Sequence, residues 1–319
     1  MNVVYMGTPE FARGPLATLA DSRHTVLAVV TGVDKQIGRG RRLLSTPVKQ
    51  EASNRNLPVI SAPSLKSDDL YQTLKKLNAD LFVVVAFRIL PENLFSLPKL
   101  GAINVHASLL PKYRGAAPIN WAIINGESET GLTSFFLTKE VDAGGVILQE
   151  RTALGSEEIF DSLYARLSQM AGPFLLRTLD VIESGQRHPI AQDGSAACPA
   201  PKITPFNAMI DFGFPAENVR NFVRGLSTRP GAYTLFRGQR MKVLASRISE
   251  TTPTEQLRPG AILPDKKRLL VQCRQSVIEL TRVVPGGKAE MDGTSFINGF
   301  RLQSAEVLGE TLRGIKEQK

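Results

Sequence analysis

An unbroken apolar run from Leu81 to Ala86 constrains the fold of this chain more than any other feature. It lacks the alternation of a half-exposed strand, so it predicts a parallel strand that is buried on both faces. We predict further strands at Asn2 to Met6, Thr25 to Thr31 and Ala102 to His106, with helices between them. Strands that alternate with helices in this way are typical of a doubly wound α/β domain with a mostly parallel sheet.

The length and a change of period predict two domains. A chain of 319 residues is too long for one ordinary core. From about His188 to Asn207 the periodicity lapses, and glycine, serine and four prolines mark a linker. We therefore expect a first domain at residues 1–189, a linker at 190–207 and a second domain at 208–319.

The residues after the linker predict a helix and then a small β-barrel. Five short strands are expected at Ala232–Phe236, Lys242–Arg247, Ala261–Leu263, Leu269–Cys273 and Ile278–Val283. Most of the charge lies here, since residues 208–319 carry +7 and residues 1–207 only +2 of the total of +9. A basic module beside a near-neutral one suggests a polyanionic partner, but charge alone favours the plainer interpretation of a surface adapted for solubility.

Several classes of protein are disfavoured by composition. No apolar run reaches the ~20 residues of a membrane span, and because Met1 leads directly into an apolar run we expect no export signal. The two cysteines, Cys198 and Cys273, lie far apart, so we expect a cytoplasmic protein without disulfides. The histidines His24, His106 and His188 have no metal-ligand spacing, which predicts no metal site. No apolar helix face is left over for assembly, which favours a monomer.

A polar pair at the end of a predicted strand marks a candidate catalytic site. Asn104 and His106 are two residues apart, so they share one face of the strand near the edge where open α/β sheets bind ligands. Together with Asp142 they suit attack by an external nucleophile on a carbonyl. Asn and His can donate to the developing oxyanion, while Asp can orient the imidazole or take up a proton. A lone histidine on a strand is more often structural, so this pattern alone leaves both interpretations open.

A basic segment follows the second predicted strand. Lys35 to Arg42 holds four positive charges and no negative one, and its two glycines predict a flexible loop that could contact phosphates. An ordinary solvated loop is the alternative. The turn after the first strand, Gly7-Thr8-Pro9, has one glycine where the dinucleotide fingerprint needs three, which argues against a nicotinamide dehydrogenase.

These motifs resemble the signature of the 10-formyltetrahydrofolate-dependent formyltransferases. The signature is carried by Asn104-Val105-His106-Ala107-Ser108-Leu109-Leu110-Pro111, Tyr113 to Ile119 and Asp142-Ala143-Gly144. The interval from His106 to Asp142 matches the family spacing. Gly7 to Phe11, Gly38-Arg39-Gly40 and Ala208 to Phe212 narrow the resemblance to members that act on methionyl-tRNA, and it covers nearly the whole chain.

The resemblance implies a Rossmann-like catalytic domain with a folate site, followed by a basic OB-like tRNA-binding domain. It implies catalytic roles for Asn104, His106 and Asp142. It implies that the folate site is bordered by Ser108, Leu109, Leu110 and Pro111. The tRNA acceptor stem would meet the basic loop, with Arg39 at its centre and Lys35, Arg41 and Arg42 around it.

The implied reaction is transfer of the formyl group of 10-formyltetrahydrofolate, a co-substrate, to the free amino group of initiator methionyl-tRNA. The product, formylmethionyl-tRNA, would serve translation initiation. A folate enzyme that acts on a small amine or on water is the main alternative, but such a substrate needs neither the basic loop nor a basic barrel. A non-catalytic tRNA-binding protein is disfavoured by the intact Asn-His-Asp set. One departure from the family is Ala86-Phe87-Arg88-Ile89-Leu90-Pro91, which is one residue shorter than usual.

Overall fold

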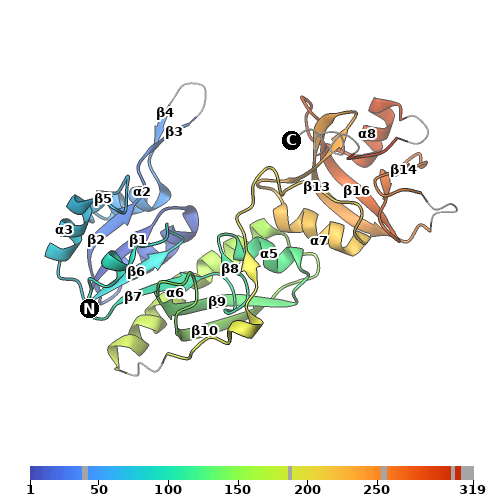
Figure 1. Ribbon diagram of the computed structural model, residues 1–319. Helices are drawn as coiled ribbons and strands as arrows, with labels where there is room; N and C mark the ends of the chain where they lie inside the picture. Colours follow the sequence, from blue (N-terminus) through green and yellow to red (C-terminus); the bar gives the residue numbers. More distant parts are fainter. Residues whose placement is uncertain (38–41, 186–188, 253–256, 303–305, 310–319) are drawn as a thin grey trace. The chain divides into compact units, whose positions relative to one another are not determined.

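The computed structural model describes residues 1–37, 42–185, 189–252, 257–302 and 306–309, with only the backbone for 35–37 and 42 (Figure 1). The chain divides into two compact units. The first consists of Met1–Pro118, Glu129–Ala153 and Tyr164–Ala200. The second consists of Ile119–Ser128, Leu154–Leu163 and the residues from Pro201 onward. No helix in the described ranges has the length and apolar character needed to cross a membrane.

The first unit is built on a seven-stranded sheet with the order β10-β9-β7-β6-β1-β2-β5. The five parallel strands are β1 (Asn2–Gly7), β2 (Thr25–Thr31), β5 (Val59–Ser61), β6 (Leu81–Val85) and β7 (Ala102–His106). β9 (Glu129–Phe136) runs antiparallel to β7, and β10 (Val146–Ala153) runs antiparallel to β9. This mixed, mostly parallel sheet confirms the predicted α/β class.

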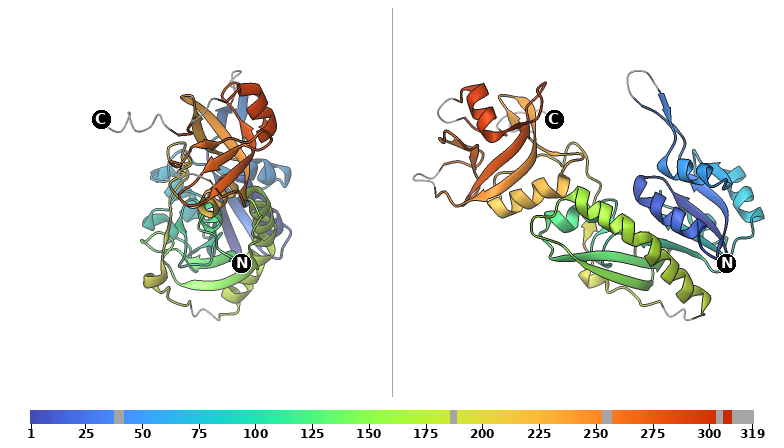
Figure 2. Two further views of the ribbon diagram at one scale, coloured as in Figure 1. Left: turned by 90° about the vertical axis from the view of Figure 1, so that its right-hand side faces the viewer. Right: turned by 180° about the vertical axis from the view of Figure 1, so that it is seen from behind.

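Helices cover both faces of this sheet, because its strands are apolar on both sides (Figure 2). The helices that follow the strands are α1 (Arg13–Ala20, after the 3-10 turn Glu10–Ala12), α2 (Pro47–Asn54), α3 (Asp68–Lys76), α4 (Glu92–Phe95) and α6 (Phe160–Glu183). On one face, Val4 and Val84 pack with Leu74 of α3 and Leu94 of α4. On the other face, the Tyr5 hydroxyl donates to the Ala12 carbonyl at the start of α1.

The basic segment differs from the sequence prediction. We expected an irregular loop, but β3 (Lys35–Ile37) and β4 (Arg42–Leu44) form an antiparallel pair in which Lys35 lies opposite Leu44. Each of these strands has only three residues, which is too short for an alternating pattern that the sequence would reveal. Arg39 and Arg41 lie outside the described residues.

The second unit contains an antiparallel half-barrel with the strand order β12-β13-β16-β15-β14, and β17 pairs with β16. The strands are β12 (Ala232–Phe236), β13 (Gln239–Ser249), β14 (Ile262–Leu263), β15 (Leu270–Gln272), β16 (Val277–Val284) and β17 (Met291–Asp292). All five predicted strands are confirmed. The Gly309 amide donates to the Leu235 carbonyl of β12, and the Leu308 amide donates to the Gly260 carbonyl just before β14. Two consecutive residues near the end of the chain therefore contact both edges of the sheet.

Three helices complete the second unit: α5 (Pro118–Ile124), whose residues from Ile119 belong here, α7 (Ala216–Leu226) and α8 (Gly293–Phe300). The Asn120 amide on α5 donates to the Gly225 carbonyl of α7 at 2.8 Å. Phe296 of α8 packs edge-on against Phe236 of β12, with 4.9 Å between the ring centroids. Helix α8 was not expected from the sequence, because its eight residues include Gly293, Asn298 and Gly299, which are weak helix formers.

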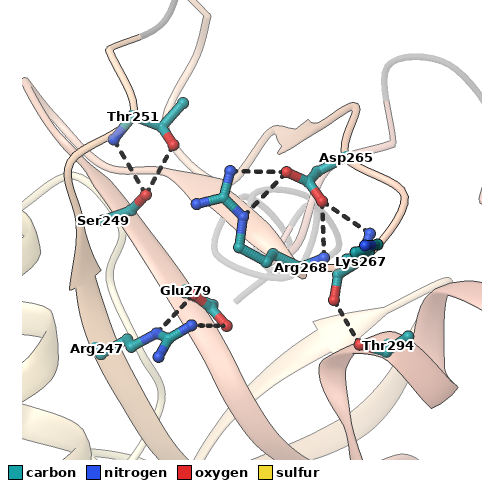
Figure 3. A network of polar contacts seen from close by, with 8 residues as sticks. All are labelled: Arg247, Ser249, Thr251, Asp265, Lys267, Arg268, Glu279 and Thr294. Carbon is teal, nitrogen blue, oxygen red and sulfur yellow. Dashed lines mark hydrogen bonds and ion pairs between the residues drawn. The ribbon is translucent and has the colours of Figure 1, made fainter.

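Part of the basic surface of the second unit is already neutralised (Figure 3). Arg247 lies opposite Glu279 on neighbouring strands and makes two parallel hydrogen bonds to it, of 2.7 and 3.1 Å. Arg268 pairs with Asp265 at 2.8 Å. The pair of Arg247 and Glu279 is bidentate, and such pairs hold their geometry well. Arg268 donates from Nε and Nη2 to the single oxygen Oδ2 of Asp265. These two arginines therefore serve the fold, and the excess positive charge of the unit comes from other residues.

Candidate active site

The strand β7 brings Asn104 and His106 to one face of the sheet. Asn104 lies opposite Val84 of β6 and Phe135 of β9, and His106 lies opposite Thr133. His106 is only 7% exposed, whereas Asn104 is half-buried. Within the described part of the chain, the Asn104 amide has no hydrogen-bond partner. Its N–H groups are therefore available to an oxygen atom of a substrate.

The imidazole of His106 is oriented by a backbone carbonyl. Its Nε2 donates to the Tyr113 carbonyl at 2.8 Å. Because a carbonyl oxygen only accepts hydrogen bonds, this contact assigns the proton of the neutral ring to Nε2. The Phe135 ring lies edge-on to the imidazole, with 6.5 Å between centroids. Nδ1 is thereby left as the acceptor, and it faces the Asp142 carboxylate with 3.9 Å between Nδ1 and Oδ2.

Asp142 lies in the connection between β9 and β10, in a conformation that few non-glycine residues adopt. Its φ is +54°, in the left-handed region. Its Oδ2 accepts a hydrogen bond of 2.8 Å from the Gly115 amide. A Cβ atom on Gly144 would lie 1.7 Å from the Phe136 carbonyl oxygen, so only glycine fits there. The Asp-Ala-Gly motif thus encodes a tight loop that presents a nearly buried carboxylate.

The Ser108–Pro111 segment follows β7 and is tied to the antiparallel edge of the sheet. The Thr133 hydroxyl donates to the Ser108 carbonyl at 2.6 Å and accepts from the Leu110 amide at 3.1 Å. Gln149 on β10 donates to the Leu110 carbonyl at 2.7 Å. One hydroxyl and one amide side chain therefore fix the path of this segment.

The four predicted folate contacts differ in accessibility. The Ser108 side chain is fully buried and donates to the Lys112 carbonyl at 2.7 Å. Leu110 is also buried, at 4% exposure. Leu109 and Pro111 are half-buried and keep accessible surface. Of this motif, Leu109 and Pro111 are the side chains that a ligand could touch without a rearrangement.

Three polar side chains near the site were missed by the sequence analysis, namely Thr133, Gln149 and Gln192. Thr133 could have been found from the strand register, because it lies directly opposite His106. Gln149 and Gln192 carry no sequence signal. Gln192 lies within the predicted linker, yet its amide donates to the carbonyls of Asp142 and Gly144.

The predicted tRNA contacts lie on a separate element of the first unit. Lys35 begins β3 and Arg42 begins β4. The other two predicted contacts, Arg39 and Arg41, belong to the connection that lies outside the described residues. The ribbon β3–β4 therefore brings the two ends of the basic segment together, with Ile37 opposite Arg42.

One group of potential metal ligands occurs in the described residues. Atoms of His24, Asp180 and Glu183 lie within 4.8 Å of one another. Cations of the protein itself already contact all three side chains. The N-terminal amine donates to Nδ1 of His24 at 3.2 Å, and Arg23 pairs with Asp180 at 2.7 Å and Glu183 at 2.6 Å. This cluster is an ion-pair network between the end of α6 and the start of β2.

Comparison with known proteins assigns both parts of the chain to known domain families. The family model Formyl transferase matches residues 1–179, and the model Formyl transferase, C-terminal domain, matches residues 202–301. The chain is 40% identical to methionyl-tRNA formyltransferase of Porphyromonas gingivalis over 313 residues, which covers 95% of this chain and 97% of the relative. It is 39% identical to methionyl-tRNA formyltransferase of Caldanaerobacter subterraneus over 310 residues, which covers 97% and 100%.

Among solved structures, the fold is similar to that of WlaRD, a sugar 3N-formyl transferase crystallised with dTDP and 5-N-formyl-THF. The TM-score is 0.66 at 15% identity, with 91% of this chain and 99% of that chain covered. A variant of HypX from Aquifex aeolicus has a TM-score of 0.62 at 17% identity, with 96% of this chain and 48% of that chain covered. At these identities the likeness concerns the fold alone.

Proposed function

Because the chain belongs to the formyl transferase family, we propose that Asn104, His106 and Asp142 carry out formyl transfer to methionyl-tRNA. The chain has the activity of its full-length relatives, methionyl-tRNA formyltransferase. The observation that carries the residue assignment is the Asn104 amide, which is free of partners among the described residues and shares a strand face with His106. Asp142 lies 3.9 Å from that imidazole.

The formyl donor is 10-formyltetrahydrofolate, bound as a co-substrate beside the Ser108–Pro111 segment. The half-buried Leu109 and Pro111 provide apolar contact surface, while Ser108 and Leu110 hold the backbone in place. The acceptor is the free amine of initiator methionyl-tRNA, and the product serves translation initiation. Relatives with methionyl-tRNA in their names, together with the basic segment Lys35–Arg42, support this acceptor.

In the addition step, the methionyl amine attacks the formyl carbon and negative charge develops on the formyl oxygen. The Asn104 amide donates to that oxygen. Preorganised donors of this kind stabilise a tetrahedral intermediate because they need no reorganisation when the charge appears. The Nε2–H of His106 is already engaged by Tyr113, so the ring can donate to the oxygen only through a protonated Nδ1. The Asp142 carboxylate stabilises that imidazolium electrostatically.

In the elimination step, the bond from the formyl carbon to N10 of the folate breaks, and N10 gains the proton that the attacking amine has released. The new amide nitrogen loses one proton, so the overall transfer is balanced. Asp142 takes up the proton of the amine, directly or through a water molecule, because its carboxylate is held by a backbone amide at one oxygen only. In this scheme His106 stabilises the charge on the formyl oxygen, and Asp142 accepts the proton of the amine.

The tRNA binds to the basic segment and to the second domain. We assign the acceptor stem to Lys35, Arg39, Arg41 and Arg42. The surplus charge of residues 208–319 provides further contacts to the phosphates. The domain boundaries proposed for this division are 1–189, 190–207 and 208–319. A fragment that ends near residue 205 tests them: it should keep folate binding and lose tRNA affinity. Binding of tRNA as tight as that of the full chain would refute a tRNA role for the second domain.

The decisive experiment measures formyl transfer from 10-formyltetrahydrofolate to methionyl initiator tRNA. Elongator methionyl-tRNA and free methionine serve as alternative acceptors in parallel reactions. We expect rapid transfer to the initiator tRNA and little to the other two. Equal transfer to free methionine would contradict the tRNA assignment. Formate release without an acceptor would instead indicate a hydrolase.

A further inference from the structure

The side chain of Gln192 connects two segments around Asp142. One is the loop that contains Asp142, and the other is the short strand Arg114–Gly115, whose Gly115 amide binds the Asp142 carboxylate. Its Nε2 donates to the carbonyl oxygens of Asp142 and Gly144, at 2.8 Å in each case. Its Oε1 accepts from Arg114, at 3.1 Å from Nε and 2.8 Å from Nη2. All four residues belong to the first unit.

The chemistry of these contacts requires an amide. The arginine can only donate and the two carbonyls can only accept, so the residue between them must accept on one side and donate twice on the other. The glutamine side chain meets both requirements, because its amide oxygen accepts and its NH2 group can donate two hydrogen bonds. Glutamate could accept from Arg114 but has no N–H for the carbonyls, and methionine of similar length could do neither. The orientation of the Gln192 amide is therefore determined by its neighbours.

The contacts close a ring around Asp142. Its Oδ2 accepts from the Gly115 amide, and its own carbonyl oxygen accepts from Gln192. Gly115 follows Arg114 in the chain, and Arg114 donates back to Gln192. The backbone of Asp142 has a φ of +54°, which is unfavourable for a residue with a side chain. Contacts at both ends of the residue are what hold it in that conformation.

A second contact anchors the same strand. β8 (Arg114–Gly115) pairs in parallel with β11 (Pro199–Ala200), seven residues after Gln192. The Ile190 amide and carbonyl also pair with Val146 at the start of β10. The segment that carries Gln192 is thus fixed on both sides, so its side chain reaches the Asp142 loop from a defined position.

We propose that Gln192 is a positioning residue for Asp142: it holds the carboxylate at its distance from His106 while it touches neither substrate. This inference rests on the proposed function, since it assumes that Asp142 acts in the transfer. Loss of the Gln192 amide releases the carbonyl side of the loop and allows the carboxylate to move. Displacement of a catalytic group by about 1 Å can cost ~10²-fold in rate.

The test uses Gln192→Met and Gln192→Glu in the full chain. We expect kcat to fall by ~10- to ~100-fold, with the KM values for methionyl-tRNA and formyl donor within about twofold of the parent. Gln192→Glu should be at least as impaired as Gln192→Met, because its carboxylate faces two carbonyl oxygens. The control is Asp193→Ala, which removes the cap of the neighbouring turn at Ser195 and makes no contact with the Asp142 loop. Thermal unfolding verifies that each variant is folded.

A double-mutant cycle separates this inference from the proposed function. If Gln192 acts through Asp142, then Gln192→Met should change the single-turnover rate of Asp142→Asn by less than about threefold. Full additivity of the two losses, or a normal kcat for Gln192→Glu, overturns the positioning role alone. A normal rate for Asp142→Asn would instead overturn the role of Asp142 in the proposed function. Raised KM values with unchanged kcat would show that Gln192 serves binding and would also refute the inference.

Discussion

His106 and Asp142 approach each other with 3.9 Å between Nδ1 and Oδ2, which is an ion-pair distance and too long for a hydrogen bond. Each side chain is instead held by the backbone of the segment between them. His106 donates to the Tyr113 carbonyl, and Asp142 accepts from the Gly115 amide. The two groups are thus positioned independently, and because the Gly115 amide occupies Oδ2, the second carboxylate oxygen of Asp142 and Nδ1 of His106 are the atoms left to meet a proton or a substrate atom.

Removal of either proposed oxyanion donor should slow chemistry and leave tRNA binding intact. We expect Asn104→Ala and His106→Ala each to lose ~10²–10³ in kcat, because each removes one donor to the developing charge. Single-turnover formyl transfer at saturating methionyl-tRNA measures this effect. Asn54→Ala, on the exposed end of α2, is the matched control and should be unaffected. A loss of less than about threefold at Asn104 or His106 would make the residue structural.

The loop that presents Asp142 should not tolerate a side chain at Gly144. A Cβ there would lie 1.7 Å from the Phe136 carbonyl oxygen, so Gly144→Ala must displace the loop or the end of β9. We expect destabilisation by about 1–3 kcal/mol and a reduced kcat. Urea unfolding and steady-state kinetics measure the two effects. Gly194→Ala is the control, because its Cβ would meet no atom within 4 Å; equal stability of both variants would refute the steric argument.

Acid should weaken the fold partly through His24. Burial lowers the pKa of His24, and the neighbouring N-terminal amine lowers it further. In the unfolded chain His24 takes up its proton near pH ~6.5, whereas in the folded chain it does so only at a lower pH. Just below pH ~6.5 the unfolded chain therefore binds more protons than the folded chain. The free energy of unfolding therefore falls as the pH drops through that window. We expect His24→Gln to lose less stability than the parent between pH 7.5 and pH 5 in urea titrations, and parallel losses would contradict this.

The basic segment should contribute to tRNA binding in a salt-dependent way. Arg39→Ala should raise the KM for methionyl-tRNA and reduce the slope of log K against log salt by ~0.7–0.9, the value for one phosphate contact. Binding of the formyl donor should not change. Lys76→Ala on α3 removes one exposed positive charge elsewhere and serves as the control. If the Arg39 variant kept the parent's salt slope and its activity at physiological salt, Arg39 would make no phosphate contact in the parent.

The sequence predicted the elements that depend on local pattern. The bounds of β2 and β7 agree with the prediction residue for residue, because apolar runs between turn residues define a buried strand. The common face of Asn104 and His106 follows from the period of two along any strand. Ranges with little pattern were harder: the ribbon β3–β4 was expected as a loop, and α8 was not expected at all.

In the candidate site, too, some features follow from the local sequence and others depend on contacts between distant residues. Asn104, His106 and Asp142 were identified from a motif, since their residue types and spacing suffice to suggest the chemistry. The proton on Nε2 of His106 could not be inferred, because it depends on a carbonyl seven residues away that folds back against the ring. Gln192 could not be inferred either, because its three partners are 48 to 78 residues distant in the chain.

The sequence by itself determined the strands with a clear apolar pattern and the face on which the polar pair lies, and the resemblance of its motifs to a known family indicated the chemical class of the reaction. These depend on side-chain identity and on periods that extend over a few residues. Only the tertiary structure decided how Asp142 is held, which tautomer His106 adopts, and which half of the Ser108–Pro111 motif is accessible. Those properties arise from hydrogen bonds between segments that approach one another after folding, and no local pattern encodes such an approach.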